Sequence, residues 1–338
     1  MDYTNMLECV ISGTDLNREQ SVELMNMIMG GELSAGRICA LLTALRCKGV
    51  VPEEITGFAA SMRKHANKVP GVDSQELLDT CGTGGDGLKT FNISTAAAIL
   101  CAGAGVRVAK HGNRSVSSKS GSADVLEQLG INIELPPEKV GESINTVGIG
   151  FMFAPMMHPA MKHAMPARKE LGIPTVFNIL GPLTNPAGAA HQVLGVATAE
   201  LASDLAAVLK GLGCSHALVV SGKDGSDEVS VTDPTLCIEV QNNEIRSFEI
   251  DPGAFGFTYT DKAGLTVEDA VHSANIIRNV LNGEKGIRRD ICVLNAGAGI
   301  YAADKAEDLT AGVKAAQEAI DSGSAADILE KWKEFTAG

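Results

Sequence analysis

The chain has 338 residues, of which 45% are hydrophobic and 20% are charged, and a length prior of ~150 residues per domain predicts about two globular domains. Its net charge of −13 argues against binding to nucleic acid through a basic surface, and no apolar run approaches the roughly 20 residues that span a membrane. The 8 cysteines include no C-x-x-C pair and the first residues have no signal-peptide pattern, so we expect free thiols in the cytoplasm.

Residues 1–69 have the pattern of a small all-helical domain. Asn17 and Ser34 can each cap a helix, Gln20 stands in the capping-box position after Asn17, and Pro52 suits the first turn of a third helix. A domain of 69 residues that consists of short helices forms only a marginal hydrophobic core by itself. We therefore expect this domain to bury an apolar face on the rest of the chain or on a second copy.

Residues 70–338 alternate between short apolar runs and helical patterns, which predicts a larger α/β domain with a central, mostly parallel sheet flanked by helices. The predicted strands are 77–80, 106–109, 148–153, 193–197 and 217–221. The predicted helices are 95–103, 123–129, 159–171, 201–212, 267–281, 308–321 and 325–335.

A glycine-rich segment, residues 79–95, lies between the first predicted strand and its helix. It contains G-x-G-x-x-G, but the next strand ends in the basic pair Lys110-His111, where a dinucleotide fold needs an acidic residue. Its spacing also fails the P-loop pattern by one residue. Two interpretations of this segment remain. Either the N–H groups of the turn bind an anion at a helix N-terminus, or the segment is a plain turn followed by capping residues. The polar donors at the helix start are Asn92, Ser94 and Thr95.

A basic segment, residues 110–124, follows the second predicted strand. It carries Lys110, Arg114 and Lys119 together with five serines. Cations and hydroxyl groups in one loop suit a ligand with several phosphate oxygens, although a solvated charged loop is the alternative.

An acidic pair, Asp227-Glu228, follows a predicted strand and a glycine turn. Adjacent carboxylates are hard oxygen ligands that suit Mg²⁺. A surface turn is the alternative interpretation, but two phosphate-type loops elsewhere in the chain favour a metal that shares their ligand.

Four segments carry a resemblance to a known family: DTCGTGGDGLKTFNIST, KHGNRSVSSKSGSADVLEQLG, FAPMMHPAMKHAMPARKELGIPTVFNILGPLTNPA and SDEVSV. Together they resemble the anthranilate phosphoribosyltransferases, of the nucleoside-phosphorylase-type class, and the resemblance covers the whole chain. It implies transfer of the phosphoribosyl group of 5-phosphoribosyl 1-diphosphate (PRPP) to anthranilate, which gives N-(5-phosphoribosyl)anthranilate and diphosphate in tryptophan biosynthesis. It also implies hinges between the two domains, part of 155–187 packed on the helical domain, and a homodimer formed through that domain.

The resemblance further implies the residues of the site, with two Mg²⁺ ions per chain. Because the aniline nitrogen of anthranilate is neutral at pH 7, we expect no acid–base dyad, and Lys110 acts electrostatically. The implied donor-site residues are Gly82, Gly85, Asp86, Thr90, Asn92, Ile93, Ser94, Thr95, Lys110, His111, Gly112, Asn113, Arg114, Ser115, Val116, Ser117, Ser118 and Ser122. The implied anthranilate contacts are Gly82, Asn113 and Arg168, and the implied metal ligands are Ser94, Asp227 and Glu228.

Two other functions stay open at this stage. A pyrimidine nucleoside phosphorylase shares the expected architecture and uses inorganic phosphate, although the basic segment and the acidic pair favour the transferase. Some relatives look like nucleic-acid binders, against which the net charge and the presence of Asn113 and Arg168 argue.

Overall fold

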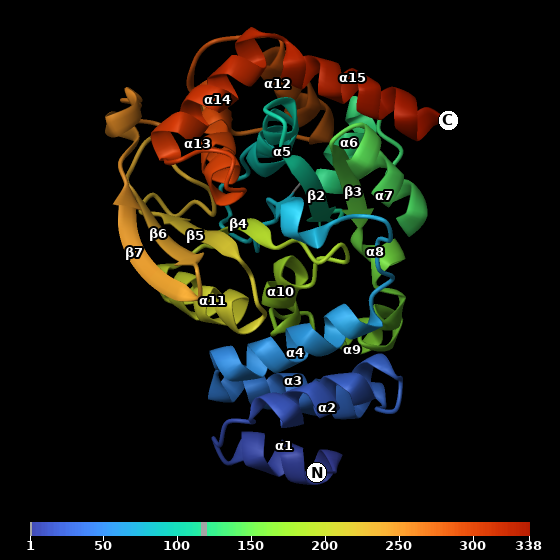
Figure 1. Cartoon of the computed structure of the whole chain (residues 1–338). Coiled ribbons are helices and arrows are strands. Elements are labelled where there is room, and N and C mark those ends of the chain that lie inside the picture. The colour runs from blue at the N-terminus through green and yellow to red at the C-terminus, as the bar shows by residue number, and fades with distance from the viewer. Residues whose placement is uncertain (1, 116–119) are drawn as a thin grey trace.

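The N-terminal helices form a small unit that stands below a larger α/β unit (Figure 1). The computed structural model describes residues 2–115 and 120–338. The small unit consists of α1 (Tyr3–Ile11), α2 (Arg18–Met29), α3 (Ala35–Lys48) and α4 (Pro52–His65). The predicted caps are confirmed, because the Asn17 side chain accepts from Gln20 N in a capping box and the Ser34 side chain accepts from Arg37 N.

The larger unit is built on one seven-stranded sheet with the order β3-β2-β1-β4-β5-β6-β7. The strands are β1 (Leu77–Asp79), β2 (Arg107–Gly112), β3 (Ile149–Phe153), β4 (His191–Gly195), β5 (His216–Gly222), β6 (Thr235–Gln241) and β7 (Glu244–Ile250). The first five strands pair in parallel, and β6 and β7 add an antiparallel edge. This confirms the predicted α/β class with a mostly parallel sheet.

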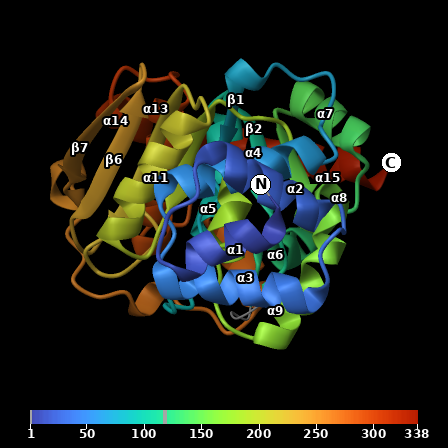
Figure 2. The same ribbon diagram turned by 90° about the horizontal axis from the view of Figure 1, so that it is seen from below.

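Helices cover both faces of the sheet (Figures 1 and 2). They are α5 (Ile93–Gly103), α6 (Ser122–Leu129), α7 (Pro137–Thr146), α8 (Ala154–Met157), α9 (Met165–Leu171), α10 (Phe177–Leu180), α11 (Ala199–Gly211), α12 (Ala270–Leu281), α13 (Ile287–Ala302), α14 (Leu309–Asp321) and α15 (Ser324–Ala337). Short 3₁₀ turns are η1 (Ser74–Glu76), η2 (Pro159–His163), η3 (Gly181–Leu183), η4 (Pro252–Phe255) and η5 (Ala263–Leu265).

Successive residues of the central strands enter different cores, as the two-residue period of a strand requires. Val193 and Leu218 pack in the core that contains α5, α13 and α15. Leu194 and Val219 pack in a second core, which also contains apolar residues of α11 and of all four N-terminal helices. The small unit therefore buries its apolar face against the α/β unit, where α4 packs against α11 (Figure 1).

The segment 155–187 contributes to the same second core. Its buried residues Ala164, Ala167, Phe177 and Leu180 lie in the cluster with those of the N-terminal helices. α9 contacts α3, and α10 contacts α4. Apolar packing thus runs without interruption from the small unit, through this segment, to the sheet.

Several predicted boundaries are corrected by the structure. The strand predicted to end at 109 continues to Gly112, because the side chains of Lys110 and His111 are buried instead of solvated. The helix predicted over 159–171 is divided into η2 and α9. α7, α13 and the β6–β7 hairpin were not predicted. Within the described ranges no helix is both long enough and apolar enough to cross a bilayer.

Candidate active site

Three polar segments leave the sheet at the carboxyl ends of its parallel strands. The glycine-rich segment follows β1, the basic segment begins inside β2, and the acidic pair follows β5. The first and third of these segments line one small cavity, whose walls include Thr80, Gly82, Ser94, Gly195, Asp227 and Glu228. Binding sites of open α/β sheets occupy this edge, so the cavity is the candidate active site.

The glycine-rich segment has a backbone conformation with positive φ angles, which glycine adopts without strain. At Gly84, Gly85 and Gly87, φ is +66°, +89° and +74°. A Cβ on Gly82 would lie 3.1 Å from Gly195 O and 3.3 Å from Asp227 Oδ2, so the absence of a side chain lets the loop approach the acidic pair. Thr83 N–H donates to Gly195 O at 2.9 Å and fixes that approach.

Asn92 ties the glycine-rich segment to the basic segment. Its side chain does not cap α5. Instead its Oδ1 accepts from Ser120 Oγ at 2.7 Å and from Ser273 Oγ at 3.0 Å, and its Nδ2 donates to Ser120 O at 3.3 Å. Asn92 therefore acts as a cross-link between loops, and the alternative of a plain turn with caps does not describe it. Thr95 Oγ1 is buried behind it with no hydrogen-bond partner in the described chain.

Lys110 brings a positive charge under the cavity. Its side chain is 2% exposed, and its ammonium group donates to Thr80 O and Thr80 Oγ1, both at 3.2 Å, and to Ser94 Oγ at 3.4 Å. Among the described residues it forms no ion pair within 4.0 Å. A buried ammonium without a close counter-ion is costly, which favours an anionic ligand at this position.

The acidic pair is joined by a third carboxylate from the glycine-rich segment. Burial, and then repulsion from Asp86, raise the pKa of Asp227 to about 7. Burial and the Asp227 charge raise the pKa of Glu228 well above its usual value, against the opposing effect of Lys110. Asp86 Oδ2 is buried without a hydrogen-bond partner in the described residues. Three crowded carboxylates and an unpartnered oxygen fit a site that receives a hard divalent cation.

The loop that carries the acidic pair is held in place from two sides. Asp224 accepts from Ser226 Oγ at 2.6 Å and from Ser230 Oγ at 2.7 Å, and it forms an ion pair with Lys262 at 2.9 Å. Burial alone would raise the pKa of Asp224, but these hydrogen bonds outweigh it and lower the pKa to about 2. From α13, Asn295 exchanges two hydrogen bonds of 2.9 Å with the backbone of Val229.

Two neutral histidines, the predicted His111 and His158, form a second buried polar group. His111 Nδ1 donates to Gly181 O at 3.0 Å, and its ring centroid lies 5.1 Å from that of His158. Burial lowers the pKa of His111 to about 3 and that of His158 to about 4, so neither ring is charged at neutral pH. The Nε2 atoms of both rings are buried and lack partners among the described residues.

Arg168, on α9, has a guanidinium group that stacks over the Phe177 ring at 5.3 Å. Burial lowers the pKa of Arg168, and its guanidinium group donates to Met165 Sδ at 3.9 Å. No carboxylate within the described ranges pairs with it. A half-buried guanidinium of this kind suits a planar carboxylate ligand.

The remaining predicted residues are placed as follows. Gly112 ends β2, and a Cβ on it would lie 2.3 Å from Ser122 Oγ at the start of α6. Asn113 is exposed, and Arg114 pairs with Asp124 at 2.9 Å and with Glu127. In the glycine-rich segment Gly85 is exposed, Thr90 forms an isolated bridge to Thr266, and Ile93 is buried at the start of α5. Ser115 N–H donates to Asp124 Oδ2 at 3.2 Å. Val116, Ser117, Ser118 and Lys119 lie outside the described residues.

Sequence reasoning overlooked a buried carboxylate, Asp79, at the end of β1. It accepts from His111 N–H at 3.2 Å and from Asn185 Nδ2 at 2.7 Å. Burial raises the pKa of Asp79 to about 6, against the opposing charge of Lys110. An acidic residue that directly follows two leucines in a predicted buried strand was the available signal.

Comparisons with known proteins support one family. Residues 74–326 match the model described as "Glycosyl transferase family, a/b domain", and residues 4–66 match "Glycosyl transferase family, helical bundle domain". The anthranilate phosphoribosyltransferase of Acetivibrio thermocellus is 50% identical over 97% of this chain and 94% of its own length.

Solved structures agree with this result. The anthranilate phosphoribosyltransferase of Thermus thermophilus is 43% identical, with a TM-score of 0.93 over 100% of both chains. The Saccharomyces cerevisiae enzyme in complex with PRPP and Mg is 27% identical, with a TM-score of 0.89 over 99% of this chain and 98% of that one. The same yeast enzyme has also been solved in complex with 4-fluoroanthranilate, at 26% identity and a TM-score of 0.88 over 99% and 97% of the two chains.

Proposed function

This chain belongs to the anthranilate phosphoribosyltransferases, and from that premise we propose how its residues divide the work of the reaction. The enzyme transfers the phosphoribosyl group of PRPP to anthranilate and releases diphosphate, a step of tryptophan biosynthesis. The observation that carries the assignment is the full-length identity of 50% to a member of the family, together with the shared cavity of the glycine-rich and acidic segments.

We assign the donor to the cavity at the carboxyl edge of the sheet. Gly82 and Ser94 line it, and backbone donors of a glycine turn and of a helix start bind phosphate oxygens. Lys110 supplies the buried positive charge beneath it. The other donor contacts are Thr90, Asn92, Ser94, Thr95, the basic segment from Lys110 to Ser118, and Ser122.

Magnesium belongs in the same cavity, with Ser94, Asp227 and Glu228 as its ligands and two ions per chain. The fit rests on the crowded carboxylates and on the unpartnered Asp86 oxygen, which a cation would compensate. When bound, Mg²⁺ neutralises the diphosphate charge that grows as the glycosidic bond breaks.

The acceptor is assigned to the neighbouring space around Gly82, Asn113 and Arg168, where the Arg168 guanidinium pairs with the anthranilate carboxylate. The aniline nitrogen attacks C1 of the ribose, the bond from C1 to the diphosphate oxygen breaks, and the nitrogen then loses a proton to water. An aniline is neutral at pH 7, so no base is needed before the attack. The chain contributes mainly orientation and the fixed charge of Lys110 near the leaving group.

The two structural units are proposed to act as hinged domains, with residues 1–69 as the helical domain, part of 155–187 packed on it, and residues 70–338 as the α/β domain. The contacts of α9 with α3 support this division. Movement about the hinges would exclude water, which otherwise hydrolyses the donor.

We also propose that the chain works in the cytoplasm as a homodimer formed through the helical domain, without a nucleic-acid partner. An apolar groove on α1 and α3 supports the dimer: its lining includes Val10, Cys39, Cys47 and Ile11, and Ile11 is 67% exposed. Sedimentation should give the mass of two chains, and Ile11→Asp should give that of one. A wild-type chain that sediments as a monomer would contradict the dimer.

The function is tested by following anthranilate fluorescence in a mixture of the chain, PRPP and Mg²⁺. Fluorescence should fall only when all three are present. A control with thymidine and inorganic phosphate addresses the phosphorylase alternative, since release of thymine there, with stable anthranilate fluorescence, would replace the assignment.

A further inference from the structure

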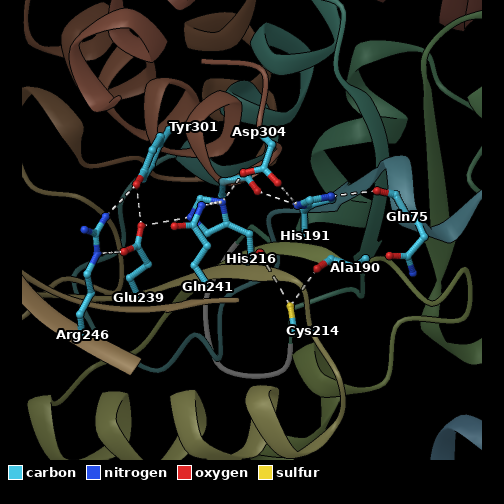
Figure 3. Close-up of polar contacts among 11 residues, drawn as sticks. Gln75, Ala190, His191, Cys214, His216, Glu239, Gln241, Arg246, Tyr301 and Asp304 are labelled. Carbon is cyan, nitrogen blue, oxygen red and sulfur yellow. Dashed lines mark hydrogen bonds and ion pairs between the residues drawn. The ribbon is translucent and has the colours of Figure 1, made fainter. Parts of the chain in front are cut away.

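A second polar cluster lies at the opposite edge of the sheet, where β4 and β5 begin, and Figure 3 shows its side chains. His191 begins β4 and His216 begins β5, and the two residues are direct partners in the parallel ladder. Asp304 follows α13 and extends its carboxylate between the two rings (Figure 3). One ligand atom from each of these three residues lies within 4.8 Å of the other two.

The two imidazole rings have the same orientation toward Asp304. His216 Nδ1 lies 2.7 Å from Asp304 Oδ1, and His191 Nδ1 lies 3.9 Å from Asp304 Oδ2. The Nε2 atoms point away to outer acceptors, at 2.9 Å from Gln75 O and 3.1 Å from Glu239 Oε1. Histidines that bind metal ions hold their second nitrogen in this manner, through an N–H donated to a carbonyl or a carboxylate.

The outer acceptors are themselves fixed. Glu239 is held by the Arg246 guanidinium and accepts from Tyr301 OH at 2.7 Å. Arg246 Nη2 also donates to Tyr301 OH at 3.0 Å. The tautomer with hydrogen on Nε2 is therefore supported for His216 by an anchored carboxylate, which leaves the Nδ1 lone pair directed inward.

The space between the rings is surrounded mainly by electron-pair donors. With the Nε2 atoms protonated, both Nδ1 lone pairs face oxygen atoms: the Asp304 carboxylate and, at 2.8 Å from His191 Nδ1, the Ala302 carbonyl. The Gln241 amide nitrogen, 3.3 Å from His216 Nδ1, can satisfy only part of this set. Lone pairs that converge in this way require a cation between them, which is either extra protons on the rings or a metal ion.

We propose that His191, His216 and Asp304 form a binding site for one divalent transition-metal ion, with zinc as the best match. Two imidazole nitrogens and one carboxylate are ligands typical of zinc and its neighbours, whereas Mg²⁺ prefers oxygen atoms alone. Ligands bound tetrahedrally at ~2.0 Å stand about 3.3 Å apart, so small side-chain movements close the site. The side chains of His191 and His216 are 8% and 0% exposed, and that of Asp304 is 55% exposed, which gives the ion a path from solvent.

The site would connect the end of α13 to the first residues of two central strands. α13 also carries Asn295, which holds the acidic loop at the other edge of the sheet. A metal ion here would therefore stabilise the fold, and it would touch none of the reacting groups. The expected effect is on thermal unfolding and not on kcat.

The test uses the full-length chain stripped with EDTA and then kept in a large excess of Mg²⁺, which competes with the added ion for the acidic cluster. Calorimetric titration with ZnCl₂ should give one ion per chain, and zinc should raise the melting temperature. Titration with Co²⁺ should give visible d–d bands of a nitrogen-ligated site. Asp304→Asn removes one ligand and is tolerated by the local backbone, since asparagine also accepts the φ of 55° at this position.

Asp304→Asn should weaken zinc binding by at least about tenfold and abolish the shift in melting temperature, while kcat with Mg²⁺ stays within about twofold of the wild type. Glu307→Gln, which alters an exposed carboxylate three residues on, is the matched control and should bind zinc normally. A second variant, His191→Gln, should also lose the site. The proposal is overturned if the Mg²⁺-saturated chain binds no zinc, or if both ligand variants bind it as tightly as the wild type. Neither result bears on anthranilate consumption, which tests the enzyme function separately.

Discussion

The two edges of the parallel strands use similar residue types and distribute their charges in opposite ways. At the carboxyl edge Asp86, Asp227 and Glu228 crowd together, and unpartnered buried atoms remain. At the amino edge, the buried carboxylate of Glu239 is compensated by the Arg246 guanidinium and by the hydroxyl group of Tyr301. Carboxylates that repel each other in the protein alone need a ligand, whereas a carboxylate that is paired with a guanidinium group does not. The comparison distinguishes the proposed substrate site from the proposed structural site within one sheet.

The largest effect is expected from neutralising the acidic pair. Asp227→Asn combined with Glu228→Gln should lower kcat/KM by at least about 10²-fold and change the Mg²⁺ dependence, because the proposed metal ligands are lost while the shape of the loop is kept. Steady-state kinetics over a range of Mg²⁺ concentrations measure both. Asp233→Asn, in the same loop but outside the acidic cluster, is the control. An unchanged Mg²⁺ dependence in the double variant would remove these residues from the metal site.

The next effect separates the position of the acidic loop from its charge. A Cβ on Gly195 would stand 1.6 Å from Asp227 O, so Gly195→Ala must displace the acidic loop and keep every titratable group. We expect activity to fall by about 10²-fold, since displacements near 1 Å have this effect. Gly36→Ala is the control, because nothing lies within 4 Å of the added Cβ. Full activity in Gly195→Ala would mean that the position of the acidic pair is unimportant.

Much of the fold was predictable, because its signals are local. The caps at Asn17 and Ser34 need only neighbouring residues. α13 was missed because its residues are buried on nearly all sides, so it has no polar face to give a helical period. β7 was missed for the opposite reason, since most of its residues are exposed and give no apolar alternation.

The site was predictable as residue types and not as contacts. A glycine turn and an adjacent carboxylate couple suggest phosphate and magnesium from sequence alone. Contacts between distant parts of the chain depend on the tertiary fold. They include the approach of Asp86 to Asp227 and the hydrogen bond from Asn185 to Asp79, which are 106 residues apart in the sequence. Lys110 was assigned to a loop because a lysine in a polar run usually reaches solvent; its burial depends on Thr80 and Ser94.

A smaller effect is expected at the acceptor side. Arg168→Ala should raise the KM for anthranilate about 10- to 100-fold and leave the KM for PRPP nearly unchanged, because one charged hydrogen-bond partner of the acceptor carboxylate is lost. The exposed neighbour gives the control Lys169→Ala. Kinetics with each substrate varied in turn decide the matter, and a raised KM for PRPP alone would move Arg168 to the donor site.

The smallest effects concern stability, where the two edges should respond with opposite signs. At the carboxyl edge the pKa of Asp227 is raised from 3.8 to about 7, so the folded state binds this proton more tightly than the unfolded state. The metal-free chain should therefore lose stability as the pH rises from about 4 to about 7. In urea unfolding at pH 8, the free energy of unfolding of Asp227→Asn should exceed that of the wild type by at least about 1 kcal/mol, and this difference should vanish near pH 4.

At the amino edge, Tyr301→Phe should lower stability. The Tyr301 hydroxyl donates to Glu239 Oε1 at 2.7 Å, and its loss leaves a fully buried carboxylate with one donor fewer. The expected cost is about 1 kcal/mol in urea unfolding, with kcat unchanged because this side chain lies far along the strands from the cavity. If both variants changed stability in the same direction, charge compensation would not distinguish the two edges. Opposite signs, with activity lost only in Asp227→Asn, would establish that the chain gives up stability at the edge where it binds its substrates.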